Sequence, residues 1–199
     1  MKNIVKFIFD RIAALLGLIL LLPFIVFISF FIAVSSGFPV FFIQKRVGKN
    51  GKLFRMIKFR TMKKNDSKNT VSVKGDSRIT KTGAFLRKYK LDELPELWNV
   101  LTGQMSFVGP RPDVPGYADV LKGGDRKILK LRPGITGPAT LKYANEEELL
   151  AGVEDFVKYN DEVIFPDKVR INLRYYHKHS FILDLKIIFA TIFRTKVNF

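Results

Sequence analysis

The chain of 199 residues contains no cysteine, only one tryptophan and only two histidines. The absence of cysteine excludes disulfides and thiolate metal sites, and it is compatible with a protein that faces the cytosol. His177 and His179 lie two residues apart in a basic stretch, which is not the helical spacing of a metal site. We therefore interpret both histidines as surface or interface residues.

Acidic residues are also scarce, with 18 Asp and Glu against 34 Lys and Arg, and the formal net charge is +16. Such a charge indicates an anionic partner, which composition leaves open among nucleic acid, an anionic lipid surface and a phosphorylated small substrate. Phenylalanine is abundant, with 19 copies against six of tyrosine. Because phenylalanine surfaces suit acyl chains better than nucleotide bases, this composition favours the membrane.

The longest hydrophobic run extends from Ile12 to Val34 without a charged residue. At about 1.5 Å per residue it is long enough to cross a hydrocarbon core of roughly 30 Å, and it is too long for a cleavable signal peptide. Pro23 lies at its centre, where it removes a helical hydrogen bond and clashes with the carbonyl of Ile19. Basic residues flank both ends, which favours the same membrane face for both. The residues alone leave a spanning helix and a re-entrant helix equally open.

Patterns after this run predict several short elements. Apolar-rich runs at 40–46 and 53–62 flank Asn50-Gly51, a strong turn signal, and predict a β-hairpin. Residues 65–76 are polar and predict a loop. Residues 82–89 predict a helix with Phe85 and Leu86 facing inward.

Two helices are predicted nearer the C-terminus. The stretch 145–157 predicts an acidic amphipathic helix that supports the surface, and 180–195 predicts a helix with a wide apolar face. That face suits either a protein core or the headgroup layer of a membrane.

The most informative stretch is 91–112, which places Asp92 and Glu93 just before an apolar run. Proline is tolerated in the first turn of a helix, so Pro95 predicts a helix from about Glu93 to Leu101, with Asp92 as N-cap and Gly103 as its stop. The helix dipole would then favour a charged Asp92 and an approaching phosphate. Acidic residues are also ordinary capping residues, so the pair by itself has a purely structural interpretation.

Cations and stiff segments surround this pair. Arg87, Lys88, Lys90 and Arg111 lie within about twenty residues and are suited to hold a diphosphate. The stretches 107–115 and 132–138 are rich in proline and glycine, which predicts extended, stiff chain that either holds Arg111 in place or simply stiffens two loops.

The motifs KFRTM, LDELP, SFVGPRP and RPGITG occur in this order, and together they resemble the bacterial sugar transferase family, specifically the small monotopic phosphoglycosyl transferases. The resemblance covers nearly the whole chain. It implies an α/β (α+β) fold that is mostly helical with a small β-hairpin or sheet. It further implies a re-entrant helix-break-helix over 1–38 with its kink at Pro23, followed by a cytosolic catalytic domain over 39–199 with membrane-interfacial helices.

The resemblance also implies a reaction, in which a sugar-1-phosphate passes from a UDP-sugar to a polyprenyl phosphate through a covalent adduct on Asp92, with release of UMP. Glu93 and Asp92 would hold Mg²⁺. The phosphate-binding residues would be Lys58, Arg87 and Arg111, although Lys58 also fits a solvated strand edge. The implied partners are the UDP-sugar, the polyprenyl phosphate and the lipid bilayer of the bacterial inner membrane, with a homodimer left open and no nucleic acid.

The chain departs from the family pattern at five positions. Family members commonly carry Ser where Leu22 stands, Gln at Glu96, Asp at Gln104, Gly at Tyr143 and Arg at Ala144. The missing arginine bears on nucleotide binding, and the transferred sugar is not readable from the motifs. Two other classes of protein remain as alternatives: a non-catalytic, membrane-docked basic scaffold and a nucleic-acid-binding protein.

Overall fold

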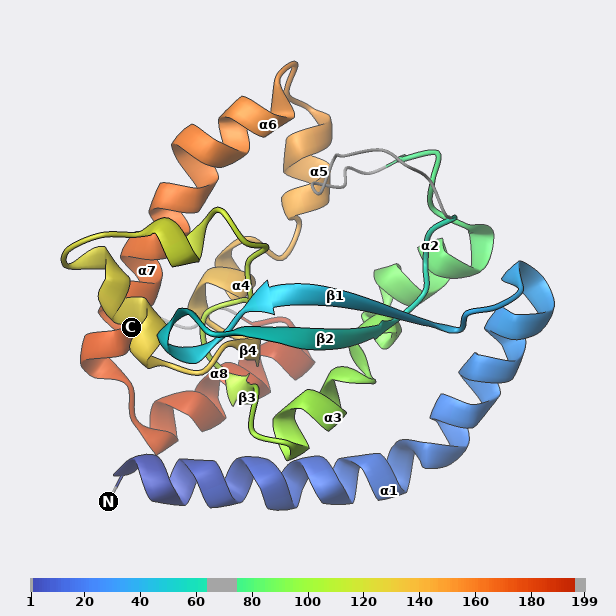
Figure 1. The fold of residues 1–199 in the computed structure, drawn as a ribbon, viewed down its shortest axis with the longest axis horizontal. Coiled ribbons are helices and arrows are strands. Elements are labelled where there is room, and N and C mark those ends of the chain that lie inside the picture. The colour runs from blue at the N-terminus through green and yellow to red at the C-terminus, as the bar shows by residue number, and fades with distance from the viewer. Residues whose placement is uncertain (1, 64–74, 196–199) are drawn as a thin grey trace.

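The computed structural model describes residues 2–63 and 75–195, with side chains from residue 4 onward, and it shows a mixed helical fold with two small sheets (Figure 1). The predicted mostly helical α/β class is thereby confirmed. The predicted loop at 65–76 falls largely outside the described residues. The strands are β1 Phe41–Val47, β2 Leu53–Phe59, β3 Ser106–Val108 and β4 Gly134–Thr136. The helices are α1 Lys2–Ser36, α2 Lys81–Lys88, α3 Glu96–Leu101, α4 Pro138–Lys142, α5 Glu146–Ala151, α6 Phe156–Tyr159, α7 Phe165–Lys178 and α8 Phe181–Phe193.

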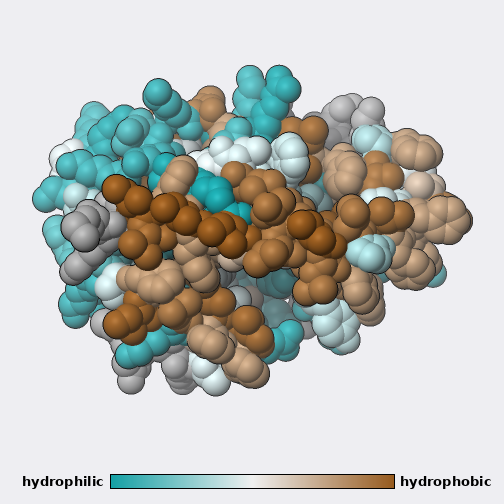
Figure 2. Space-filling view, turned by 90° about the horizontal axis from the view of Figure 1, so that it is seen from below, coloured by the Kyte–Doolittle hydropathy of each residue, from teal (hydrophilic) through white to brown (hydrophobic). Residues whose placement is uncertain are grey.

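Helix α1 runs beneath the rest of the molecule and bends partway along its length (Figure 1), with Pro23 inside the helix. Its stretch Ile4–Ser36 is long and apolar enough to cross a membrane, and its most apolar 18-residue window has a mean hydropathy of 3.0 and is only 11% buried. Figure 2 views this side and shows a band of hydrophobic residues across it. The predicted re-entry into a membrane stays a prediction.

Polar contacts attach the first part of α1 to the rest of the chain. The Ser106 hydroxyl of β3 donates to Asp10 Oδ2 at 2.7 Å, and Asp10 is 3% exposed. Lys6 Nζ lies 2.6 Å from Asp184 Oδ2 of α8. The other oxygen of this carboxylate, Oδ1, accepts a hydrogen bond from the Tyr175 hydroxyl. Lys6 and Asp10, two of the few charged residues of this apolar helix, therefore lie on the side that faces the protein.

The predicted hairpin is present. Strands β1 and β2 pair antiparallel from Phe41 opposite Phe59 to Val47 opposite Leu53. Asn50 and Gly51 both adopt positive φ, at 59° and 78°, which these two residue types tolerate best. The turn signal in the sequence thus located the hairpin correctly.

The second sheet is parallel, with Ser106 opposite Gly134 and Val108 opposite Thr136. Just beyond it, Gly109 N–H donates to Thr136 O at 2.9 Å, and Gly134 N–H donates to Pro110 O at 2.8 Å. A Cβ at Gly134 would lie 2.2 Å from Gly109 N, so the two backbones approach too closely for any side chain. This contact holds the extended segment that carries Arg111.

Three details differ from the sequence-based predictions. Phe85 points outward, at 58% exposed, while Leu86 alone of the pair is buried. The predicted helix at 145–157 is interrupted, since α5 ends at Ala151 before Gly152 and α6 begins only at Phe156. Helix α7 was not predicted, because charged and polar residues alternate with its buried Val169, Ile171 and Tyr175. The helix predicted at 180–195 is confirmed as α8.

The close approach at Gly134 yields a test. Gly134→Ala should lower the free energy of unfolding by about 3 kcal/mol, because its methyl group meets backbone atoms that cannot move aside independently. Gly124→Ala is the matched control, since nothing lies within 4 Å of a Cβ there and its φ is −63°. Denaturant titration of both variants in detergent measures the difference, and equal stabilities would contradict the interlock.

Candidate active site

Asp92 and Glu93 lie in a 3₁₀ turn, Leu91–Glu93, between α2 and α3. The prediction that Asp92 caps a helix starting at Glu93 is wrong, because α3 begins at Glu96 with Pro95 as its N-cap. Pro95 has no N–H, so i→i−4 hydrogen bonding cannot pass through it. Leu94 N–H instead donates to Leu91 O at 3.2 Å. The predicted stop is confirmed, since Gly103 follows the helix with φ 86°.

Asn99 fixes α3 against the hairpin. Its side chain is 1% exposed, its Nδ2 donates to Arg55 O at 2.8 Å, and its Oδ1 accepts from Ile57 N–H at 3.1 Å. One amide thus pairs with the backbone of β2 as a neighbouring strand would. This pairing brings the start of α3 opposite Lys58. The sequence did not reveal either of the two hydrogen bonds.

Lys58 and Arg111 converge on Glu93. Lys58 Nζ lies 2.8 Å from Glu93 Oε1 and 3.2 Å from Glu96 Oε1, so one ammonium group serves two carboxylates. Arg111 Nη2 lies 2.7 Å from the same Glu93 oxygen. The structure therefore brings together three of the predicted site residues and adds Glu96, which the sequence offered only as a departure from the family pattern.

Arg87 is oriented differently. Its guanidinium pairs with Glu147 of α5, although its charge still acts on Asp92 and favours the ionised form. The predicted phosphate-binding role of Arg87 accordingly stays a prediction, and Glu147 holds this arginine beside the site.

The electrostatics of the two neighbouring carboxylates are opposite. Burial by itself raises the pKa of Glu93, but the charges of Arg111 and Lys58 outweigh it and hold that pKa well below its usual range. For Asp92, burial and the charge of Glu93 raise the pKa, against the charges of Lys58 and Arg87. The expected help from a helix dipole is wrong, because α3 begins only at Glu96, and burial with the charge of Glu93 raises the pKa of Asp92 instead of lowering it.

Two more buried acids share this neighbourhood. Burial and Glu93 raise the pKa of Glu96 to about 7, despite the nearby charge of Lys58. Burial likewise raises the pKa of Asp113 to about 6, against the charges of Lys168 and Arg46. The site thus holds one firmly ionised carboxylate among several that retain protons more readily.

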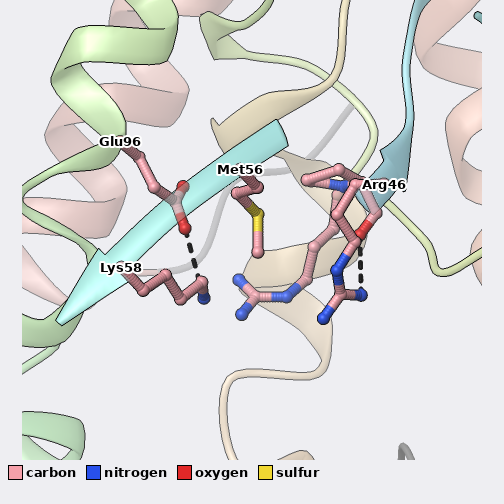
Figure 3. A pocket seen from close by; sticks show the side chains of 6 residues that line it. Arg46, Met56, Lys58 and Glu96 are labelled. Atoms are coloured by element: carbon pink, nitrogen blue, oxygen red, sulfur yellow. Dashed lines mark hydrogen bonds and ion pairs between the residues drawn. The ribbon is translucent and has the colours of Figure 1, made fainter. Parts of the chain in front are cut away.

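A small pocket lies between the hairpin and the Arg111 segment (Figure 3). Its volume of about 10 Å³ is room for about one water molecule. Arg46 of β1 lines it, a residue that the sequence indicated only as a flanking positive charge. The hairpin register contained a usable signal, since Gln44 faces Met56 across the strands and so places Arg46 on the same face as Lys58. The other lining residues are Met56, Lys58, Glu96, Arg111 and Pro112.

The donor set fits a magnesium ion that also binds a substrate phosphate. Asp92 Oδ1 is buried and has no hydrogen-bond partner within the described part of the chain. The same part contains no cluster of three or more His, Cys, Asp and Glu arranged as metal ligands. Because Mg²⁺ is usually held by one or two carboxylates together with substrate phosphates, Asp92 and Glu93 are the residues that would hold it.

Buried carboxylates faced by lysine and arginine, next to an apolar helix that the protein barely covers, are typical of enzymes that act on phosphorylated substrates at membranes. Comparison with known families supports this class. The profile described as "Bacterial sugar transferase" matches residues 1–197. The chain belongs to the bacterial sugar transferase family, as the motifs predicted.

Individual relatives agree with this assignment. The chain is 38% identical to a UDP-glucose:undecaprenyl-phosphate glucose-1-phosphate transferase of Klebsiella pneumoniae, over 95% of this chain and 39% of the relative. It is 35% identical to the uncharacterized sugar transferase EpsL of Bacillus subtilis, over 98% of this chain and 89% of the relative. A putative undecaprenyl-phosphate N-acetylgalactosaminyl 1-phosphate transferase of Bacillus subtilis is 39% identical over 62% of this chain and 76% of its own length. The chain therefore spans less than half of the Klebsiella relative and most of the shorter ones.

The raised pKa of Glu96 predicts a dependence of stability on pH. Native Glu96 keeps its proton above the usual value of 4.5, where the unfolded chain has released it, so stability falls as the pH rises from about 4.5 to about 7. In Glu96→Gln this slope should flatten by up to about 1.4 kcal/mol per pH unit, while Asp92 and Asp113 preserve the remainder.

Denaturant titrations at several pH values measure the slope, and exposed Glu154→Gln serves as the control. A slope unchanged by Glu96→Gln would show that Lys58 keeps Glu96 ionised in the folded protein.

Proposed function

We propose that this chain transfers a sugar-1-phosphate from a UDP-sugar to a polyprenyl phosphate. The observation that carries the proposal is the buried Asp92–Glu93 pair faced by Lys58 and Arg111. Two of the relatives described above are named as transferases of sugar-1-phosphates onto undecaprenyl phosphate. A membrane-docked scaffold or a nucleic-acid-binding protein would not need this buried cluster of carboxylates and cations.

In the first half-reaction, an oxygen of Asp92 attacks the phosphorus next to the sugar. The bond from that phosphorus to the bridging oxygen breaks, and UMP leaves with the electron pair. The product is an acyl phosphate on Asp92 that retains the sugar. Oδ1 suits this role, since no described residue occupies it with a hydrogen bond.

In the second half-reaction, a phosphate oxygen of the polyprenyl phosphate attacks the same phosphorus. The bond to Asp92 breaks, the carboxylate is regenerated, and a polyprenyl diphosphate sugar departs. Splitting the displacement between two anions into two steps allows a single set of cations to assist both.

Lys58, Glu93 and Arg111 form the electrostatic frame for these steps. The two cations lie on one oxygen of Glu93, so their charges are held in place before the substrate binds and are aimed where phosphate charge develops. Mg²⁺ bound by Asp92 and Glu93 would neutralise charge on the diphosphate that otherwise repels the nucleophile. We assign Arg87 to the substrate phosphates through its charge near Asp92.

A membrane location follows from the acceptor, whose long chain stays in the bilayer while its phosphate meets a soluble nucleotide. The bent, barely covered α1 supports a monotopic arrangement at the cytosolic face of the inner membrane, with both of its ends on that side.

The covalent step has a direct test. Asp92→Asn should abolish both turnover and adduct, because the amide is a poor nucleophile, and it should fold, because burial and Glu93 already disfavour a charge at this position. Intact-protein mass spectrometry after quenching with donor alone, across a panel of UDP-sugars with Mg²⁺, measures the adduct. Glu93→Gln should retain the nucleophile but react far more slowly.

A phosphosugar on wild-type protein that is missing in Asp92→Asn is the expected pattern and also identifies the sugar. Appreciable turnover by folded Asp92→Asn would overturn the covalent route. Absence of adduct and of UMP release across the whole panel would favour a scaffold.

The topology has a second test, which the natural absence of cysteine makes clean. Single variants Lys2→Cys and Asn198→Cys should both resist a membrane-impermeant maleimide in intact cells and both react after permeabilisation, because a re-entrant α1 leaves both ends in the cytosol. Labelling of only one position in intact cells would show that α1 spans the membrane.

A further inference from the structure

Arg46 is the one basic residue lining the pocket whose charge the mechanism above leaves unused. It lines the same small pocket as Lys58 and Arg111, and Figure 3 shows its side chain extending from β1 beside this pocket. Three cations therefore line a pocket whose only acidic lining residue is Glu96. That carboxylate is already shared with Lys58 at 3.2 Å.

The hydrogen bonds of Arg46 leave much of its guanidinium unused. Arginine has five N–H donors. Nη1 donates to Pro112 O at 3.1 Å and Nη2 donates to Gln44 Oε1 at 2.7 Å. Nε is buried and has no partner among the described residues. A buried donor without a partner costs about 1–3 kcal/mol, so the site is incomplete as the protein alone supplies it.

The charge of Arg46 is also uncompensated at close range. Within residues 4–63 and 75–195 no carboxylate lies at ion-pair distance from it. Burial and the neighbouring charge of Arg111 lower its pKa to about 10, which leaves it a cation at neutral pH. Arg111 is paired with Glu93, whereas only the more distant acids Asp113, Glu96 and Glu93 offset the charge of Arg46, so an entering phosphate would bring an anion into direct contact with it.

We propose that Arg46 is an anion-binding residue that joins Arg111 and Lys58 in holding the phosphoryl oxygens of the substrate. The inference rests on the proposed function, since it assigns a further residue to that site. The oxygens belong either to the diphosphate of the nucleotide sugar or to the phosphate of the lipid acceptor. Arginine suits either source, because its planar fork binds two phosphate oxygens at once.

A purely structural role for Arg46 makes a different prediction. Its bond to Pro112 O would then serve only to hold the Arg111 segment, and its loss would lower stability rather than anion affinity. Arg46→Gln removes the charge, whereas Arg46→Lys keeps it. Exposed Arg126→Gln is the matched control, because Arg126 Nη1 also donates only to backbone oxygens, those of Asp119 and Leu121.

The experiment titrates UDP into each purified, detergent-solubilised full chain by calorimetry with Mg²⁺, and records the melting temperature without ligand. It also measures KM for the UDP-sugar and for polyprenyl phosphate. We expect Arg46→Gln to weaken UDP binding at least tenfold and to flatten its salt dependence, with little change in melting temperature. Arg46→Lys should recover part of the affinity, and Arg126→Gln should match wild type.

The two sources separate in the kinetics. A rise of at least tenfold in the KM of the UDP-sugar, together with weaker UDP binding, assigns Arg46 to the donor. Unchanged UDP binding with the same rise in the KM of polyprenyl phosphate assigns it to the acceptor.

Wild-type values for UDP binding and for both KM constants in Arg46→Gln would overturn the inference. A large drop in melting temperature with no recovery of affinity in Arg46→Lys would also overturn it, in favour of the structural role. These outcomes are distinct from failure of the proposed function, which is absence of the Asp92 adduct in wild-type protein. If the adduct is absent, the UDP titration still tests whether Arg46 binds anions.

Discussion

The site depends on one amide, that of Asn99, which joins α3 to the backbone of β2. Its two hydrogen bonds with β2, to Arg55 O and from Ile57 N–H, leave little freedom between helix and hairpin. Lys58 follows Ile57 directly, so this junction sets where its ammonium group lies relative to Glu93 and Glu96. Ion pairs between buried groups need accurate geometry to offset desolvation, and a buried amide supplies it without adding charge.

The acids of the site lie where water is scarce. Glu93 is stabilised as an anion by two cations, while its presence raises the pKa of both Asp92 and Glu96. Acids that lie together in this way titrate as a coupled set rather than as individuals. A substrate that brings phosphates and a metal would redistribute these protons, which makes the site responsive to what it binds.

The sequence predicted the parts of the molecule that are determined locally. Asn50-Gly51 located the hairpin, the apolar stripe located α8, and the ordered motifs identified the family. The start of α3 was misplaced because Pro95 fits both a first helical turn and an N-cap position. Asn99 and Arg46 escaped notice because their roles depend on contacts between segments far apart in the chain. Phe85 was assigned inward because amphipathic spacing says which residues share a face but not which neighbour covers them.

The anchoring of α1 has a mechanical consequence. Lys6 and Asp10 hold this helix to α8 and β3, and a slip of one residue would rotate it by about 100° and break both contacts. The helix therefore cannot slide or turn to suit bilayers of different thickness. If α1 lies in lipid as proposed, its depth is fixed relative to the rest of the protein, and the bilayer must change its local thickness to match it.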